Sequence, residues 1–171
     1  FTPFREAFFK LLELPFDIED CAFENFDTQY SLSQYGRPDL RFINSNTEIL
    51  FEIKVYDTGL TDNQPTAYYN YLKTKSNNTK KALILIMPKH YYNHNTYNNL
   101  LAKVQSKRDN IYTTTIHWED LSKVITDIEL DQISPIFYEY SNFLNYWFDL
   151  TPINFDSLNI TTMFDKKFPE S

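Results

Sequence analysis

The spacing of hydrophobic and polar positions separates helices from strands along this chain. Over residues 2–15, apolar side chains recur every three or four positions, and the segment opens on Thr2-Pro3, a typical helix start. A second segment with helical spacing covers residues 64–73 and follows the polar residues 61–64, which resemble a helix cap. The pattern therefore predicts helices over 2–15 and 64–73.

Other segments carry the patterns that are typical of strands. Residues 40–43 and 49–56 flank a polar turn at 44–47, which predicts a β-hairpin. Residues 82–87 form a short apolar run between turn signals, as expected of a buried strand. An irregular strand is expected within residues 22–32, where aromatic and β-branched residues alternate imperfectly.

The second half of the chain predicts accessory elements. They are a helix over 95–107, an edge strand over 112–117, a short helix over 118–126 and a longer helix over 133–148. No clear period follows Pro152. The expected order is therefore α-β-β-β-α-β, followed by accessory helices and a strand.

A length of 171 residues favours a single α/β domain, with a core over about 2–90 and accessory elements over 91–171. Because the chain begins with Phe1 rather than methionine, one domain of a longer protein is the alternative. No stretch approaches the roughly 18 apolar residues of a membrane span. The single Cys21 fits a reducing compartment, so we expect a cytoplasmic location without membrane contact.

Charge narrows the classes of function. The net charge of −7 argues against a positively charged coat that binds nucleic acid non-specifically. It does not exclude a nuclease, because a bound divalent cation or a partner domain can supply local positive charge. Aromatic residues make up 18% of the chain and supply much of the area that a core can bury.

Chemistry-bearing side chains gather at the predicted hairpin. Asp39 directly precedes its first strand and Glu52 lies late in its second, so both carboxylates are expected at one edge of the sheet. Alternation places Glu52 and Lys54 on one face and Ile53 on the other. Two carboxylates and the carbonyl of Ile53 form an all-oxygen site suited to Mg²⁺ or Mn²⁺. A lysine beside them can orient the attacking water or stabilise charge on a phosphate.

This pattern, Pro38-Asp39 followed by Glu52-Ile53-Lys54, resembles the motif of the PD-(D/E)XK nuclease superfamily. The resemblance extends to Gly36-Arg37 before the motif and to Gln64 at the start of the next helix. It implies a restriction-endonuclease-like fold, in which an αβββαβ core has a central mixed sheet flanked by helices, here with C-terminal helical additions.

The resemblance also implies further site residues. In many members a glutamine completes the active site and a glutamate on the first helix contributes to it. These positions correspond to Gln64 and Glu6, with Glu13 on the same helix as a second choice for the glutamate. Positive groups aid phosphate binding, and aromatic rings stack on bases. The candidates for substrate contact are Arg37, Tyr68 and Lys73.

The function implied by the resemblance is a Mg²⁺- or Mn²⁺-dependent deoxyribonuclease, an endonuclease of bacterial restriction or anti-phage defence. Asp39, Glu52 and Ile53 would bind the metal, and Lys54 would act on the water. The expected partners are DNA and either a second copy of the chain, to cut both strands, or a regulatory domain. Two other classes stay open: a non-catalytic relative that binds nucleic acid or protein, and an interaction module with an incidental motif, which the acidic charge favours.

Overall fold

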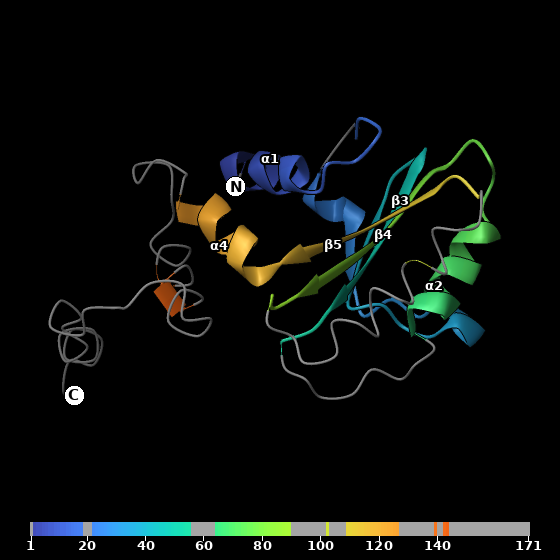
Figure 1. Cartoon of the computed structure of the whole chain (residues 1–171). Helices are drawn as coiled ribbons and strands as arrows, with labels where there is room; N and C mark the ends of the chain where they lie inside the picture. Colours follow the sequence, from blue (N-terminus) through green and yellow to red (C-terminus); the bar gives the residue numbers. More distant parts are fainter. Residues whose placement is uncertain are drawn as a thin grey trace, which may run out of the picture.

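The protein is an α/β structure with one mixed, open sheet of five strands (Figure 1). The computed structural model describes residues 2–18, 22–55, 64–89, 102, 109–126, 139 and 142–143. In chain order the helices and strands are α1 (Thr2–Leu11), β1 (Phe26–Thr28), β2 (Leu40–Ile43), β3 (Thr47–Ile53), α2 (Gln64–Lys73), β4 (Lys80–Met87), β5 (Ile111–His117) and α4 (Trp118–Thr126). Two short 3-10 helices, η1 (Phe23–Asn25) and η2 (Ser33–Tyr35), flank β1.

The strands lie in the spatial order β1-β2-β3-β4-β5. β1 pairs antiparallel with β2, and β2 with β3, whereas β3, β4 and β5 run parallel to one another. A short hairpin turn suffices between β2 and β3, but parallel neighbours need a crossover. Helix α2 supplies the crossover between β3 and β4, so the α-β-β-β-α-β order expected from the sequence is confirmed.

Helices cover both faces of the sheet, and α1 and α2 lie on opposite sides of it (Figure 1). The face under α1 and α4 carries one apolar core, whose members include Leu12, Phe42, Ile49, Phe51, Ile84 and Leu121. The face under α2 carries a second core, formed by Leu32, Leu50, Tyr68, Tyr69, Leu72 and Leu83. Alternation along β3 therefore turns Glu48, Leu50 and Glu52 toward α2.

The hairpin and the helices predicted over 64–73 and 118–126 agree closely with the structure. Helix α2 and helix α4 begin and end at the expected residues, and β5 is an edge strand as expected. Strand β3 starts two residues earlier than expected because Asn44 makes a tight turn. The Asn44 Oδ1 atom accepts hydrogen bonds from the backbone N–H groups of Asn46 and Thr47, at 3.0 and 2.8 Å.

Other boundaries differ from the expectation. Helix α1 ends at Leu11 rather than at residue 15, because Glu13 adopts a left-handed φ of 47° that cannot continue a helix. Within 22–32 only Phe26–Thr28 forms a strand, and Gln29 then turns left-handed at a φ of 57°. The helices expected over 95–107 and 133–148, and the chain after Pro152, lie almost entirely outside the described residues.

None of the helices in the described part of the chain combines the length and apolarity that a membrane crossing requires.

Candidate functional site

The candidate site lies where β3 ends, beside the residue that precedes β2. Leu40 pairs with Phe51 in the hairpin, which brings Asp39 next to Glu52 as the sequence predicts. The Asp39 carboxylate accepts a hydrogen bond from the backbone N–H of Ile53 at 2.8 Å and a longer one from Gln29 Nε2 at 3.3 Å. The end of β3, through Ile53, and the residue that follows β1, Gln29, therefore fix the position of this carboxylate.

Glu52 is almost fully buried, with 1% of its surface exposed. Its Oε1 atom forms an ion pair with the Lys54 ammonium. Its Oε2 atom is buried and has no hydrogen-bond partner among the described residues. Burial raises the pKa of Glu52; the Lys54 ammonium opposes this effect, and the charge of Asp39 adds to it. A cation beside Oε2 would favour the ionised carboxylate.

Lys54 follows the last residue of β3 and is held by three elements. Its backbone N–H donates to the carbonyl of Ile86 in β4 at 2.8 Å. Its carbonyl accepts a hydrogen bond from the indole N–H of Trp118, the first residue of α4, also at 2.8 Å. Its ammonium reaches Gln64 Oε1, at the start of α2, at 3.5 Å. The end of β3 is thus fixed in the sheet while the Lys54 side chain stays partly exposed.

Tyr68 lies one helical turn after Gln64 and is completely buried. Its hydroxyl donates to the carbonyl of Arg37 at 2.9 Å. Burial raises the pKa of Tyr68, and the nearby charge of Glu52 raises it further, so the hydroxyl remains a donor. Although the hydroxyl lies close to Glu52, its proton goes to the Arg37 carbonyl. Tyr68 therefore supports the segment that precedes Asp39. Its ring is buried, as in the alternative of core packing, and is not placed to stack on a base.

Gly36 packs directly against this tyrosine. Its φ of 93° lies in the region that favours glycine, and a Cβ atom there would meet the Tyr68 ring at 3.5 Å. Arg37, the next residue, is exposed at the surface beside the site, where a substrate-binding side chain is expected.

The structure does not bring two of the predicted site residues into this cluster. Lys73 lies at the far end of α2, about 13 Å from Gln64 along the helix axis, and its ammonium pairs with Asp109 at 3.2 Å. Glu6 is exposed on α1, which covers the opposite face of the sheet from Glu52. Sequence order alone could not place α1 on that face.

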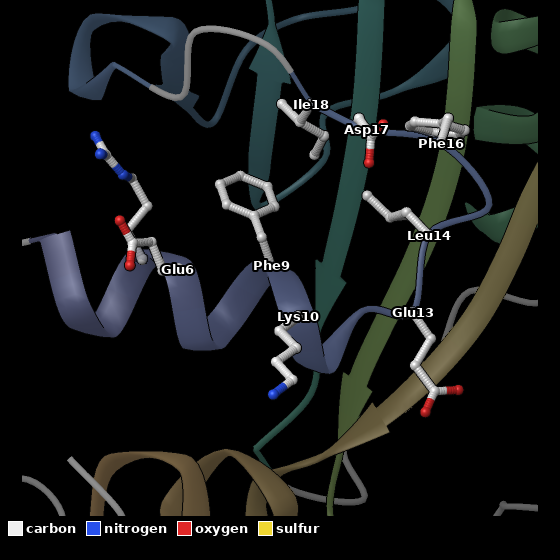
Figure 2. A pocket seen from close by; sticks show the side chains of 9 residues that line it. Glu6, Phe9, Lys10, Glu13, Leu14, Phe16, Asp17 and Ile18 are labelled. Carbon is white, nitrogen blue, oxygen red and sulfur yellow. The ribbon is translucent and has the colours of Figure 1, made fainter.

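Glu6 instead borders a separate cavity of about 510 Å³ (Figure 2). Figure 2 shows Phe9 projecting from α1 toward Ile18, with Leu14 and Phe16 on the segment that follows the helix. Charges of both signs line this cavity, so it has no clear preference for an anion or a cation.

Gln29 and Trp118 hold the site but were not among the predicted residues. Gln29 contacts Asp39 through its side chain, and its backbone N–H also donates to the Asp39 carbonyl at 3.2 Å. Nothing in their local patterns distinguishes them, because each acts on a residue that is distant in sequence.

A second buried glutamate on the same face of β3 differs from Glu52. Both oxygens of Glu48 have partners: Oε1 accepts from Arg41 Nε and the Tyr71 hydroxyl, each at 2.8 Å, and Oε2 pairs with Lys75 at 3.3 Å. Both carboxylate oxygens of Glu48 therefore have partners, whereas Oε2 of Glu52 has none among the described residues.

The donors of the site suit a hard divalent cation. In the described part of the chain, no group of three His, Cys, Asp or Glu side chains is placed to hold a metal. Asp39 and Glu52 supply only two carboxylates, so the other ligands would be the Ile53 carbonyl and water, as is common for Mg²⁺. The buried Glu52 Oε2 without a partner fits such a cation, because an isolated buried carboxylate oxygen is costly.

Comparison with protein-family models, with curated proteins and with solved structures finds no match to this chain. The resemblance to PD-(D/E)XK nucleases therefore depends on the motif and on the order of the elements.

Proposed function

We propose that this chain is a metal-dependent nuclease that hydrolyses phosphodiester bonds in DNA. The observation that carries the proposal is the unpartnered, buried Oε2 of Glu52, beside Asp39 and opposite an oxygen already paired with Lys54. A purely structural ion pair would satisfy both oxygens, as Glu48 does on the same strand. An open carboxylate oxygen is instead what a cation site requires.

Each residue has a distinct role in this proposal. Asp39 and Glu52, with the carbonyl of Ile53, would bind Mg²⁺ or Mn²⁺, which supplies Lewis acidity and a hydroxide nucleophile at neutral pH. Lys54 places a positive charge next to the carboxylates, where it can orient the attacking water and stabilise the negative charge that develops on the phosphate. Gln64 limits the range of positions open to the lysine ammonium.

Substrate contact is assigned to Arg37, which is exposed next to Asp39. The guanidinium can bind a phosphate of the DNA backbone in a bidentate way. Because the chain has a net charge of −7, a second copy or a partner domain is expected to provide more of the binding surface. The role in restriction or anti-phage defence, by endonucleolytic cutting, follows from the resemblance alone.

Cleavage of plasmid and linear DNA tests the proposal. We compare the wild type with Lys54→Met and Asp39→Asn, in Mg²⁺, in Mn²⁺ and in EDTA. Each substitution is expected to reduce the rate by about 100-fold or more, because it removes a charge that acts in the transition state. Lys10→Met is the matched control, since Lys10 is an exposed lysine on α1, and it is expected to cleave at the wild-type rate.

Cleavage in EDTA, or unchanged rates in both site variants, would overturn the proposal. The alternative is a non-catalytic relative that binds nucleic acid or protein. It would be favoured if the wild type binds DNA but cuts neither DNA nor RNA with either ion.

A further inference from the structure

An exposed tyrosine lies beside the candidate site, on the connection between β1 and β2. Tyr30 is 44% exposed and is one of three large apolar side chains at the surface in the described part of the chain. It directly follows Gln29, whose side chain and backbone N–H both contact Asp39. The backbone of Tyr30 is therefore one residue away from a contact with a proposed metal ligand.

The Tyr30 ring lies on the same face of the sheet as Glu52. The central carbon of the Arg41 guanidinium is 4.2 Å from the centroid of this ring. Arg41 is itself held by Glu48 at 2.8 Å and by Asp27 at 3.5 Å, and Glu48 shares the α2-covered face of β3 with Glu52. A cation–π contact thus fixes the ring over Arg41, while much of its surface stays open to solvent.

An exposed guanidinium lies on the neighbouring segment. Two backbone hydrogen bonds, of 3.2 and 2.8 Å, join residues 29–32 to residues 36–39, so the two segments run side by side in opposite directions. In this register Tyr30 lies diagonally across from Arg37, which is exposed two residues before Asp39. An aromatic ring and a guanidinium therefore border the proposed metal ligand from two adjacent segments.

These two side chains match the two parts of one unpaired nucleotide. A guanidinium binds phosphate in a bidentate way, and an aromatic ring stacks on any base. Inside a duplex the faces of each base are covered by its neighbours, so a base must leave the stack before it can contact a protein ring. Because the chain has a net charge of −7, stacking compensates for a weak overall attraction to phosphates.

We propose that Tyr30 stacks on an unpaired base of the DNA substrate while Arg37 binds the adjoining phosphate. The site then selects single-stranded or locally opened DNA over closed duplex. This inference takes its substrate class, DNA, from the proposed nuclease function. Negative supercoiling favours the opening of base pairs, so a plasmid also offers such a base.

Fluorescence anisotropy of labelled oligonucleotides measures the binding. All proteins carry Lys54→Met, which is expected to slow cleavage, and Mg²⁺ is present. The ligands are an oligothymidylate of about ten nucleotides, a duplex of the same length, and a deoxyribose-phosphate strand of the same length without bases. The oligothymidylate is expected to bind about fivefold or more tightly than the duplex, because only its bases are free to stack.

The variant Tyr30→Leu removes the ring but keeps an apolar side chain, and it is expected to weaken oligothymidylate binding about fivefold or more. Tyr30→Phe keeps the ring and is the matched control, so it should bind as its parent does. Both variants should bind the strand without bases equally, because nothing in it can stack. Arg37→Met should weaken binding of all three ligands and reduce the salt slope by about one, whereas Tyr30→Leu leaves that slope unchanged.

The proposal is overturned if the duplex binds as tightly as the single strand, or if Tyr30→Leu and Tyr30→Phe bind the single strand equally. A matching loss of affinity of Tyr30→Leu for the strand without bases overturns it as well, since that loss would come from the support that the ring gives to Arg41. Failure of the nuclease is distinguishable. Binding that depends on Tyr30, without cleavage by the wild type, refutes the nuclease alone; cleavage by the wild type with equal binding of the two Tyr30 variants refutes the stacking contact alone.

Discussion

Glu48 and Glu52 form a matched pair that tests how burial acts on a carboxylate in this sheet. Both lie on the face of β3 that α2 covers, and they are 2% and 1% exposed. Glu48 has partners at both oxygens, whereas Glu52 has Lys54 at one oxygen and no described partner at the other. We therefore expect glutamine substitutions at the two positions to change stability in opposite directions.

The magnitudes follow from these contacts. Glutamine keeps a polar atom at the position of Oε2 but carries no charge, so it avoids the desolvation penalty that raises the pKa of Glu52 and gives up only a pair with a partly exposed lysine, worth about 0–1 kcal/mol. In the absence of metal, Glu52→Gln is expected to stabilise the protein by about 1 kcal/mol at pH 8, or roughly 2–4 °C in Tm. Glu48→Gln removes the carboxylate shared by the buried Arg41 and the partly exposed Lys75, and is expected to cost about 3 kcal/mol.

The pH dependence has a definite sign. Because the pKa of Glu52 is raised above its ordinary value of 4.5, the folded protein holds this proton more tightly than the unfolded chain does. The corresponding stability is fully present below pH 4.5 and is lost as the pH rises through the folded pKa. The gain from Glu52→Gln is therefore expected at pH 8 and should disappear near pH 4.

Urea unfolding followed by circular dichroism measures these differences at both pH values, first without divalent ions. Saturating Mg²⁺ should then stabilise the wild type, by about 2.7 kcal/mol at a concentration 100 times Kd, but not Glu52→Gln. If Glu52→Gln destabilises the metal-free protein at pH 8 as much as Glu48→Gln does, the ion pair with Lys54 outweighs burial and the reasoning is wrong.

Three further substitutions test the support of the site. Gly36→Ala is expected to cost about 1–2 kcal/mol in thermal unfolding, because its φ of 93° strains other residues; an unchanged Tm would contradict this. Tyr68→Phe removes the bond to the Arg37 carbonyl and should lose about 1 kcal/mol in urea unfolding, so equal midpoints would show that the bond contributes nothing. Trp118→Phe frees the Lys54 carbonyl and should lower kcat of DNA cleavage about tenfold with little change in KM; steady-state kinetics with equal kcat values would refute a positioning role.

The hairpin and the meeting of its two acidic residues could be predicted because both depend on local rules. Alternation decides that Glu52 and Lys54 share a face, and hairpin pairing decides that Asp39 lies beside Glu52. Helix α2 could be predicted for the same reason, since its hydrophobic spacing is contained in a few consecutive residues. These parts of the fold need no knowledge of distant contacts.

The positions of Glu6, Tyr68 and Trp118 depend on tertiary packing and could not be predicted in the same way. The pattern of α1 shows that it has an apolar stripe, but not which face of the sheet the stripe covers. A tyrosine one turn into a helix can stack on a base or fill a core, and the spacing of its neighbours in the sequence is the same in both cases. Tyr68 fills the core because the Arg37 carbonyl provides an acceptor from a segment 31 residues earlier.

The alternation along β3 has a consequence for how the chain finds its fold. Glu48 and Glu52 stand at two points of the strand on one face, while Ile49, Phe51 and Ile53 pack among phenylalanines on the other. If β3 paired one residue out of register, both glutamates would enter that aromatic layer; Lys54 would move with Glu52, but Arg41, which lies on β2, would stay on the other face and Glu48 would lose it. Glu52, proposed for catalysis, and Glu48, which has a structural role, thus also specify the register of β3, because a misaligned sheet would bury their charges among aromatic rings.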